Sequence, residues 1–116
     1  MKKLIAATSI ALATMIAPVS AHAEFVTGNK LLSWLDSSDE TDIALGMGYV
    51  TGVFDAMSGV MVCAPTSVTV RQVVDMTKRA LHAVPEARNK SADQFITTVA
   101  SAQWPCKKKT SGNTNV

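Results

Sequence analysis

The chain has 116 residues, of which 47% are hydrophobic, and its eleven Lys and Arg residues against nine Asp and Glu residues give a formal net charge of +2. This length suits one small domain, and the balanced charge leaves no basic face of the kind that nucleic-acid binding needs. Three of the cations form the run Lys107–Lys109, which we interpret as a solvated tail rather than an anionic docking site.

Residues 1–23 are typical of a bacterial secretory signal peptide. Two lysines follow the first Met, an uncharged apolar run comes next, and residues 21–23, Ala-His-Ala, supply the small-x-small pattern that signal peptidase accepts. We therefore expect cleavage after Ala23 and a periplasmic mature chain that begins at Glu24. An uncleaved membrane anchor is the alternative, because the apolar run approaches the length of a short transmembrane helix.

The mature chain predicts an all-α fold, a small bundle of about four to five helices stapled by one disulfide. We place this single domain at residues 24–106 and a disordered polar tail at residues 107–116. A short first helix is expected around Leu31–Leu35, with Trp34 as its anchor in the core.

A second helix is expected to run roughly from Thr41 to Met61. Ser37, Ser38 or Asp39 can cap its N-terminus, and acidic residues in its first turn suit the helix dipole. Apolar residues at three- and four-residue steps predict a buried stripe. The stripe consists of Ile43, Met47, Val50, Phe54, Met57 and Met61.

Gly48, Gly52 and Ala56 fall four residues apart on a neighbouring face of this helix. A glycine inside a helix costs about 1 kcal/mol relative to alanine, so these glycines require a reason. We expect the close approach of a second helix, either within the fold or across a dimer.

A third helix is expected after the turn at residues 64–66. Thr69 and Gln72 have the T-x-x-Q spacing of a capping box, although Ser67 is a competing cap. The β-branched residues here make a strand over residues 68–74 the competing assignment. The residues expected to face inward are Val70, Val73, Val74, Leu81 and Val84.

Pro85 ends the third helix and can serve as the first position of another. A last helix is expected to stop at Trp104-Pro105, directly before Cys106. Its apolar face consists of Ala92, Phe95, Ile96, Val99 and Ala102.

The two cysteines, Cys63 and Cys106, are interpreted first as one disulfide because the chain is exported. Such a bridge would contribute on the order of 4 kcal/mol in the chain-entropy model. A nucleophilic Cys–His pair with His82, the one histidine of the mature chain, is the alternative. The sequence has no metal-ligand cluster, phosphate loop or G-x-S-x-G motif. We therefore expect no catalytic residue, no metal and no cofactor.

Several short motifs follow one another between residues 48 and 106. They are Gly48-Tyr49-x-x-Gly52, Cys63-x-Pro65, Val68-Thr69-x-x-Gln72, Pro85-Glu86-x-Arg88, Ala92 and Trp104-Pro105-Cys106. Their order and spacing resemble the Tai family, periplasmic immunity proteins that neutralise amidase effectors delivered by type VI secretion systems. The chain departs from the family in one place, since members often carry a further cysteine in the first helix, where this chain reads LLSWLDSS.

The resemblance implies an all-helical fold, a signal peptide and a disulfide between Cys63 and Cys106. It also implies a homodimer that inhibits a papain-like peptidoglycan amidase by blocking the active-site groove of the enzyme. On that interpretation, no residue of this chain performs chemistry.

The inhibitory surface is not part of the matched motifs. Our expectation for it is the polar loop of Ser37, Ser38, Asp39 and Glu40, together with the turn at residues 64–67. Acidic loop residues can contact a cationic groove, but the same residues can also act only as helix caps.

A function of a different class is that of a periplasmic acid-stress chaperone of the small helical, single-disulfide type. Such chaperones are similar to this chain in size, signal peptide and helix content. The element C-x-P-x-x-V-T-x-x-Q, residues 63–72, favours immunity.

Overall fold

The computed structural model describes residues 25–107, so the predicted signal peptide and the tail beyond Lys107 lie outside the described residues. Within residues 25–107 the chain forms four α-helices and a short 3-10 helix, with no strand beyond isolated bridges. The elements are α1 (Gly28–Leu35), α2 (Glu40–Met57), α3 (Val70–Ala83), η1 (Pro85–Ala87) and α4 (Ala92–Gln103). The prediction of a small all-α bundle with one disulfide is confirmed.

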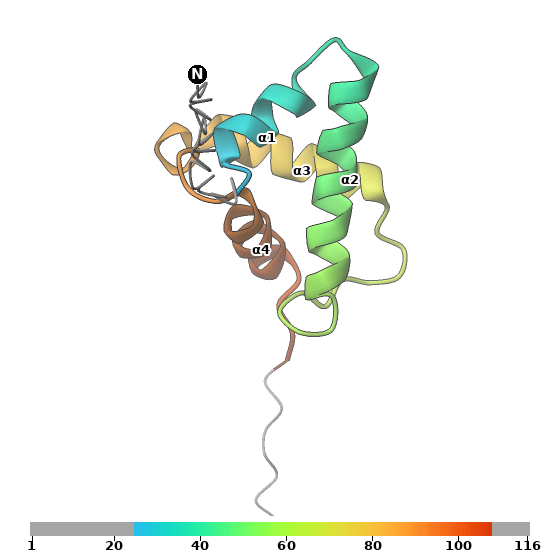
Figure 1. The fold of residues 1–116 in the computed structure, drawn as a ribbon. Helices are drawn as coiled ribbons and strands as arrows, with labels where there is room; N and C mark the ends of the chain where they lie inside the picture. The colour runs from blue at the N-terminus through green and yellow to red at the C-terminus, as the bar shows by residue number, and fades with distance from the viewer. Residues whose placement is uncertain (1–24, 108–116) are drawn as a thin grey trace, which may run out of the picture.

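The longest helix, α2, packs against each of the other three α-helices (Figure 1). In Figure 1 it runs down one side of the molecule, with the α1–α2 loop at its upper end and the α2–α3 loop at its lower end. The described chain ends beside the α2–α3 loop. The two loops that the sequence suggested as a contact surface, residues 37–40 and 64–67, therefore lie at opposite ends of one helix.

The core takes at least one fully buried side chain from each α-helix, namely Leu31 in α1, Val50 in α2, Leu81 in α3 and Ile96 in α4. Burying a side chain of this size stabilises a fold by roughly 1.5–3 kcal/mol. Trp34 is only half-buried at the edge of this core, where its ring meets that of Tyr49 edge-to-face at 6.5 Å.

Helix α2 ends four residues earlier than predicted, at Met57, with Ser58 as its C-cap. Gly59 follows with φ +78°, a backbone conformation that favours glycine. The Met57 carbonyl accepts hydrogen bonds from the amides of residues 60, 61 and 62, so the chain curls into a tight turn. Met61 is consequently half exposed, and its place in the predicted buried stripe was wrong.

Other members of the predicted inner faces also lie outward. Met47, Val70 and Ala102 are exposed, whereas Thr77 and Ala100, which were not predicted, are buried. Met47 and Ala102 stand at the edges of their apolar stripes, whereas Val70 is the first residue of α3, and at such positions the neighbouring helices decide burial.

The predicted capping box at the start of α3 is confirmed. The backbone amide of Gln72 donates to Thr69 Oγ1 at 3.2 Å, and the backbone amide of Thr69 donates to the side-chain Oε1 of Gln72 at 2.8 Å. The competing strand over residues 68–74 was wrong, because helix α3 begins at Val70. Pro85 is the first position of a helix, but this helix is the three-residue η1 and not the start of the last helix, because α4 begins at Ala92 and stops before Trp104.

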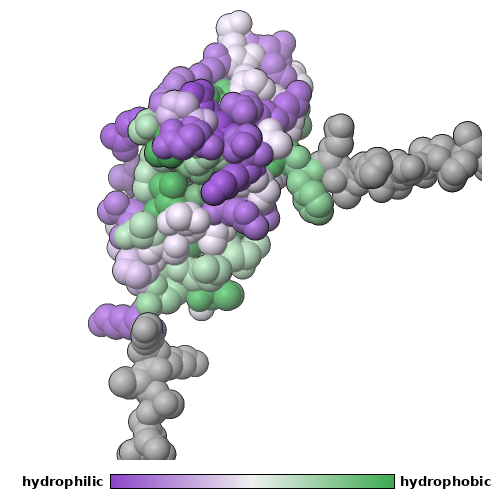
Figure 2. All heavy atoms as spheres, turned by 90° about the vertical axis from the view of Figure 1, so that its left-hand side faces the viewer, coloured by the Kyte–Doolittle hydropathy of each residue, from purple (hydrophilic) through white to green (hydrophobic). Residues whose placement is uncertain are grey.

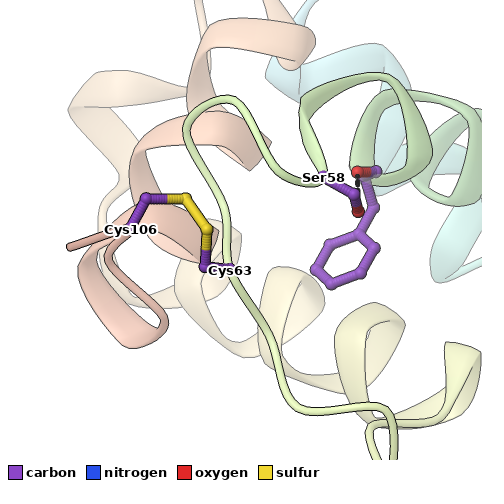
Figure 3. Close-up of a disulfide and its surroundings, with 4 residues drawn as sticks. Ser58, Cys63 and Cys106 are labelled. Carbon is purple, nitrogen blue, oxygen red and sulfur yellow. Dashed lines mark hydrogen bonds between the residues drawn. A yellow bond between two sulfur atoms is a disulfide. The ribbon is translucent and has the colours of Figure 1, made fainter. Parts of the chain in front are cut away.

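The Cys63–Cys106 disulfide joins the α2–α3 loop to the segment after α4, with the two Cα atoms 4.8 Å apart (Figure 3). Next to it, the Cys63 amide donates to the Trp104 carbonyl at 2.9 Å, and Val62 is buried and forms a bridge with Pro105. The Ser58 hydroxyl donates back to the Phe54 carbonyl at the end of α2. The α2–α3 loop is therefore fixed to the segment after α4 at two consecutive residues, Val62 and Cys63.

We predict that the double variant Cys63→Ala/Cys106→Ala is less stable than the wild type by about 2–5 kcal/mol, because the bridge links residues 43 positions apart in the sequence. Urea unfolding followed by circular dichroism measures this difference. The wild type with and without reductant is the control, and an unchanged midpoint in reductant would contradict the prediction.

Candidate interaction surface

The α1–α2 loop uses two of its four polar residues to begin α2. Asp39 Oδ1 accepts hydrogen bonds from the amides of Thr41 at 2.8 Å and Asp42 at 3.2 Å, so Asp39 is the N-cap. The Ser37 hydroxyl donates to Asp42 Oδ2 at 2.9 Å and accepts from the Asp39 amide at 3.0 Å. The side chains of Ser37 and Asp39 therefore stabilise the N-terminus of α2.

Ser38 and Glu40, by contrast, are exposed, and the described residues offer their side chains no hydrogen bond. Of the four residues expected to contact a partner, these two are free to do so without loss of the helix cap. In the described part of the chain, Glu40 forms no ion pair within 4.0 Å.

A small ionic cluster ties the end of α1 to α3. Asp36 lies 2.9 Å from His82 Nε2 and 3.2 Å from Lys78 Nζ. Burial raises the pKa of Asp36, but hydrogen bonds and positive charge from His82 and Lys78 outweigh it, and the net pKa lies below the usual value. His82 is thus engaged with a carboxylate.

The Cys–His alternative was wrong, because both cysteines are joined in the disulfide. Residues 25–107 contain no group of three or more His, Cys, Asp or Glu side chains that could hold a metal ion. None of the helices in the described part of the chain is long and apolar enough to cross a membrane.

The α2–α3 loop exposes apolar side chains that sequence reasoning missed. Val60 is 70% exposed and Met61 50% exposed, and no residue from Ala56 to Val70 carries a charge. Figure 2 agrees, since apolar residues cover much of the lower end of the molecule, where this loop lies. The Ser58-Gly59 pair was the available signal, because it favours a turn over continued helix.

Two of the glycines of α2, Gly48 and Gly52, face open space. A Cβ atom added at Gly48 or Gly52 would meet no atom within 4 Å. The expected close approach of a second helix within the fold is therefore wrong, and the alternative of a dimer stays a prediction. Gly46, which the sequence did not single out, is the glycine that α1 approaches, since its Cβ would lie 2.7 Å from Leu35 Cδ2.

A shallow apolar hollow of about 460 Å³ lies beside Gly48. It is lined by Trp34, Thr41, Ala44, Leu45, Gly48 and Tyr49. Burial, followed by the negative charge of Asp93, raises the pKa of Tyr49, so its phenol is neutral at physiological pH. The hollow is therefore uncharged.

A family model described as Rap1a immunity proteins matches residues 27–106, which include all four α-helices and both cysteines. The chain belongs to the Rap1a immunity protein family. No curated protein matches the sequence closely enough to count as a relative. Membership indicates that this Rap1a-family protein is an immunity protein that binds a cognate effector.

We predict that Asp36→Asn reduces the acid sensitivity of this protein. The pKa of Asp36 is lower in the folded than in the unfolded state, so its contribution is present above the unfolded pKa and is lost as pH falls through the folded pKa. The variant should be less stable at pH 7 by at most about 1 kcal/mol, because the cluster is partly exposed. It should also lose less stability than the wild type between about pH 5 and pH 2.

Urea midpoints measured across this pH range test the prediction. Asp75→Asn is the control, since Asp75 is an exposed α3 carboxylate with no cationic partner within 4.0 Å in the described region. If the urea midpoints of the wild type and of Asp36→Asn fall by the same amount as the pH is lowered, the prediction is contradicted.

Proposed function

We propose that this protein is a periplasmic, Tai-type immunity protein that binds and inhibits a peptidoglycan amidase effector delivered by a type VI secretion system. The observation that carries the proposal is the family match across residues 27–106, the whole helical domain. The motif series from Gly48 to Cys106 supports the Tai-type assignment, and the signal-peptide pattern of residues 1–23 supports export to the periplasm.

In this proposal the protein acts by occlusion and is not an enzyme. A rigid protein that fills an active-site groove excludes the substrate without any chemical step. Two exposed features of the surface can fill such a groove. One is the apolar turn at Val60 and Met61, and the other is the loop with Ser38 and the acidic Glu40. The disulfide beside the turn reduces the ordering cost of binding.

We propose in addition that the protein is a homodimer. The support is the apolar, uncovered face of α2, where Leu45 is 50% exposed and two glycines face open space. An apolar helix face of this kind is more often an interface than a free surface.

The proposed activity is tested by co-expressing the full chain with periplasm-directed papain-like peptidoglycan amidases. We expect that cells survive at least one of these amidases and that the purified mature chain inhibits cleavage of peptidoglycan by that enzyme. A chain without residues 1–23 should fail to protect, because it stays in the cytoplasm. Protection against no amidase, with suppression of client aggregation near about pH 2–3, would instead support the acid-stress chaperone.

The acidic loop is tested by Glu40→Lys. If Glu40 faces a cationic groove, charge reversal should weaken amidase binding at least about tenfold, because like charges are then opposed. Calorimetric titration measures the change. Glu86→Lys is the matched control, since Glu86 is also an exposed acid in the first turn of a helix, η1, and should bind as the wild type does. Equal affinities for all three proteins would exclude Glu40 from the contact.

A further inference from the structure

The lysine run after Cys106 is a motif that the proposed function leaves unused. The sequence assigns Lys107–Lys109 to a solvated tail. In the structure, Lys107 is exposed and directly follows Cys106, whose bond to Cys63 ties this point of the chain to the α2–α3 loop. The other two lysines lie outside the described residues, but covalent geometry keeps their Cα atoms within about 8 Å of that of Lys107. Three cations are therefore tied to one loop.

The α2–α3 loop presents apolar side chains beside these cations. Val60 and Met61 are 70% and 50% exposed, and no residue from Ala56 to Val70 carries a charge. Residues 94–106, which contain most of α4 and lead to the disulfide, carry no charge either. Asp55, in the last turn of α2, is the acid nearest to the loop in the sequence. This end of the molecule, the lower end in Figure 1 and Figure 2, is therefore apolar with a basic margin.

The opposite end of α2 is acidic. Four carboxylates lie in or next to the α1–α2 loop, namely Asp36, Asp39, Glu40 and Asp42. Among the described residues, ion pairs within 4.0 Å reach Asp36 but not the other three. Removal of Lys2 and Lys3 with the signal peptide leaves nine cations and nine anions, so the mature chain has no formal net charge. The charge is instead separated along the 18 residues of α2, over about 27 Å.

An anionic phospholipid bilayer has the chemistry that fits the apolar and basic end. Negative headgroups attract lysines held near the surface, and apolar side chains beside them can enter the boundary between headgroups and acyl chains. Stable attachment takes two such signals, and the disulfide places both at one point. A nucleic acid would use the lysines and leave Val60 and Met61 in water, whereas a bilayer buries the apolar side chains and pairs the charges in one contact.

We propose that the turn at Val60 and Met61, together with Lys107–Lys109, docks the mature protein on the surface of an anionic phospholipid bilayer. The two apolar side chains lie at the depth of the headgroups, and the lysines lie against the phosphates. This inference goes beyond the proposed function and rests on it for one premise, export, since an exported chain meets the periplasmic face of the inner membrane. The docking itself needs no effector.

Docking at this end sets the orientation of the molecule. The loop with Ser38 and Glu40 lies at the far end of α2, about 27 Å from the turn, and the negative bilayer repels its carboxylates. This loop therefore faces away from the membrane. Of the two exposed features that can fill an amidase groove, the acidic loop is left to the effector and the apolar turn is assigned to lipid.

Co-sedimentation of the purified mature chain with lipid vesicles tests the docking. We expect binding to vesicles of phosphatidylglycerol and phosphatidylethanolamine, and binding at least about tenfold weaker to phosphatidylcholine vesicles, which have no net charge. Raising the salt concentration from about 0.05 M to about 0.5 M should weaken binding to the anionic vesicles, because the lysines are then screened. A wild type that binds both kinds of vesicle equally, or neither, would overturn the proposal.

Two sets of three substitutions separate the lysine run from the overall charge. Lys107→Gln/Lys108→Gln/Lys109→Gln should weaken binding to the anionic vesicles at least about tenfold. The matched control is Lys30→Gln/Arg79→Gln/Lys90→Gln, which reaches the same net charge. It removes exposed cations from α1, α3 and the segment before α4, which lie above the α2–α3 loop in Figure 1. Equal losses for both sets would show that net charge alone governs binding, and the proposal would be wrong.

The apolar half of the contact is tested by Val60→Ser/Met61→Ser. Both side chains are exposed, so the helical signal should be retained, while vesicle binding should weaken at least about tenfold because less apolar surface is buried. Leu45→Ser is the control and should bind as the wild type does, since Leu45 is also 50% exposed but lies in the first half of α2. Undiminished vesicle binding by the double variant would overturn the proposal, and loss of amidase inhibition in that variant would assign the turn to the effector.

A fluorescent label that is sensitive to polarity reports the orientation. Cys63 and Cys106 are bridged, so Val60→Cys and Ser38→Cys each introduce a thiol that can be labelled. On anionic vesicles the emission of the label at residue 60 should shift to shorter wavelengths, because it enters the headgroup region. The label at residue 38 should keep its spectrum in water. A shift at residue 38 and none at residue 60 would contradict the proposed orientation.

Docking and inhibition can fail separately. A wild type that inhibits an amidase but binds no anionic vesicle would overturn the docking and leave the proposed function intact. A wild type that binds anionic vesicles with the expected effects of the substitutions, but inhibits no amidase, would overturn the proposed function and leave the docking intact.

Discussion

The bond between Cys63 and Cys106 holds the segment after α4 against the loop that follows α2, and most of the remaining arrangement depends on this constraint. Two non-covalent contacts hold the same two segments together. Val62, one residue before Cys63, is buried, and the backbone amide of Cys63 donates a hydrogen bond to the Trp104 carbonyl. The loop from Ser58 to Thr69 would otherwise be long and free. Because it is held, α3 leaves it in a defined direction, and its Thr69 cap starts the helix that completes the core.

The same constraint links folding to binding. A buried Val62 and a bridged Cys63 force the two preceding side chains, Val60 and Met61, toward solvent. A turn that is already ordered loses little conformational entropy when it meets a partner, so apolar side chains on it are efficient contacts. Immunity is the role that the family membership indicates, and a preformed surface of this kind suits the binding of an effector.

Helix α2 serves two surfaces at once. Its inner face carries Val50 into the core and allows α1 to approach at Gly46, whereas its outer face presents small residues to open space. The loop before it divides its residues in a similar way, since Ser37 and Asp39 form the cap and Ser38 and Glu40 stay free. Substitutions at the free residues therefore report on binding, whereas those at the cap would also change stability.

The sequence by itself predicted the order of the helices and the residues that begin and end several of them. The helix succession, the Thr69–Gln72 capping box and the stop at Trp104 follow from short-range rules. The pairing of the two cysteines followed from their number in a chain expected to be exported. The early end of α2, the exposure of Val70 and Ala102, and the contact of His82 with Asp36 were decided by the tertiary structure. An apolar stripe tells which way a helix faces, but its edges are covered or left open by neighbours that are distant in the chain.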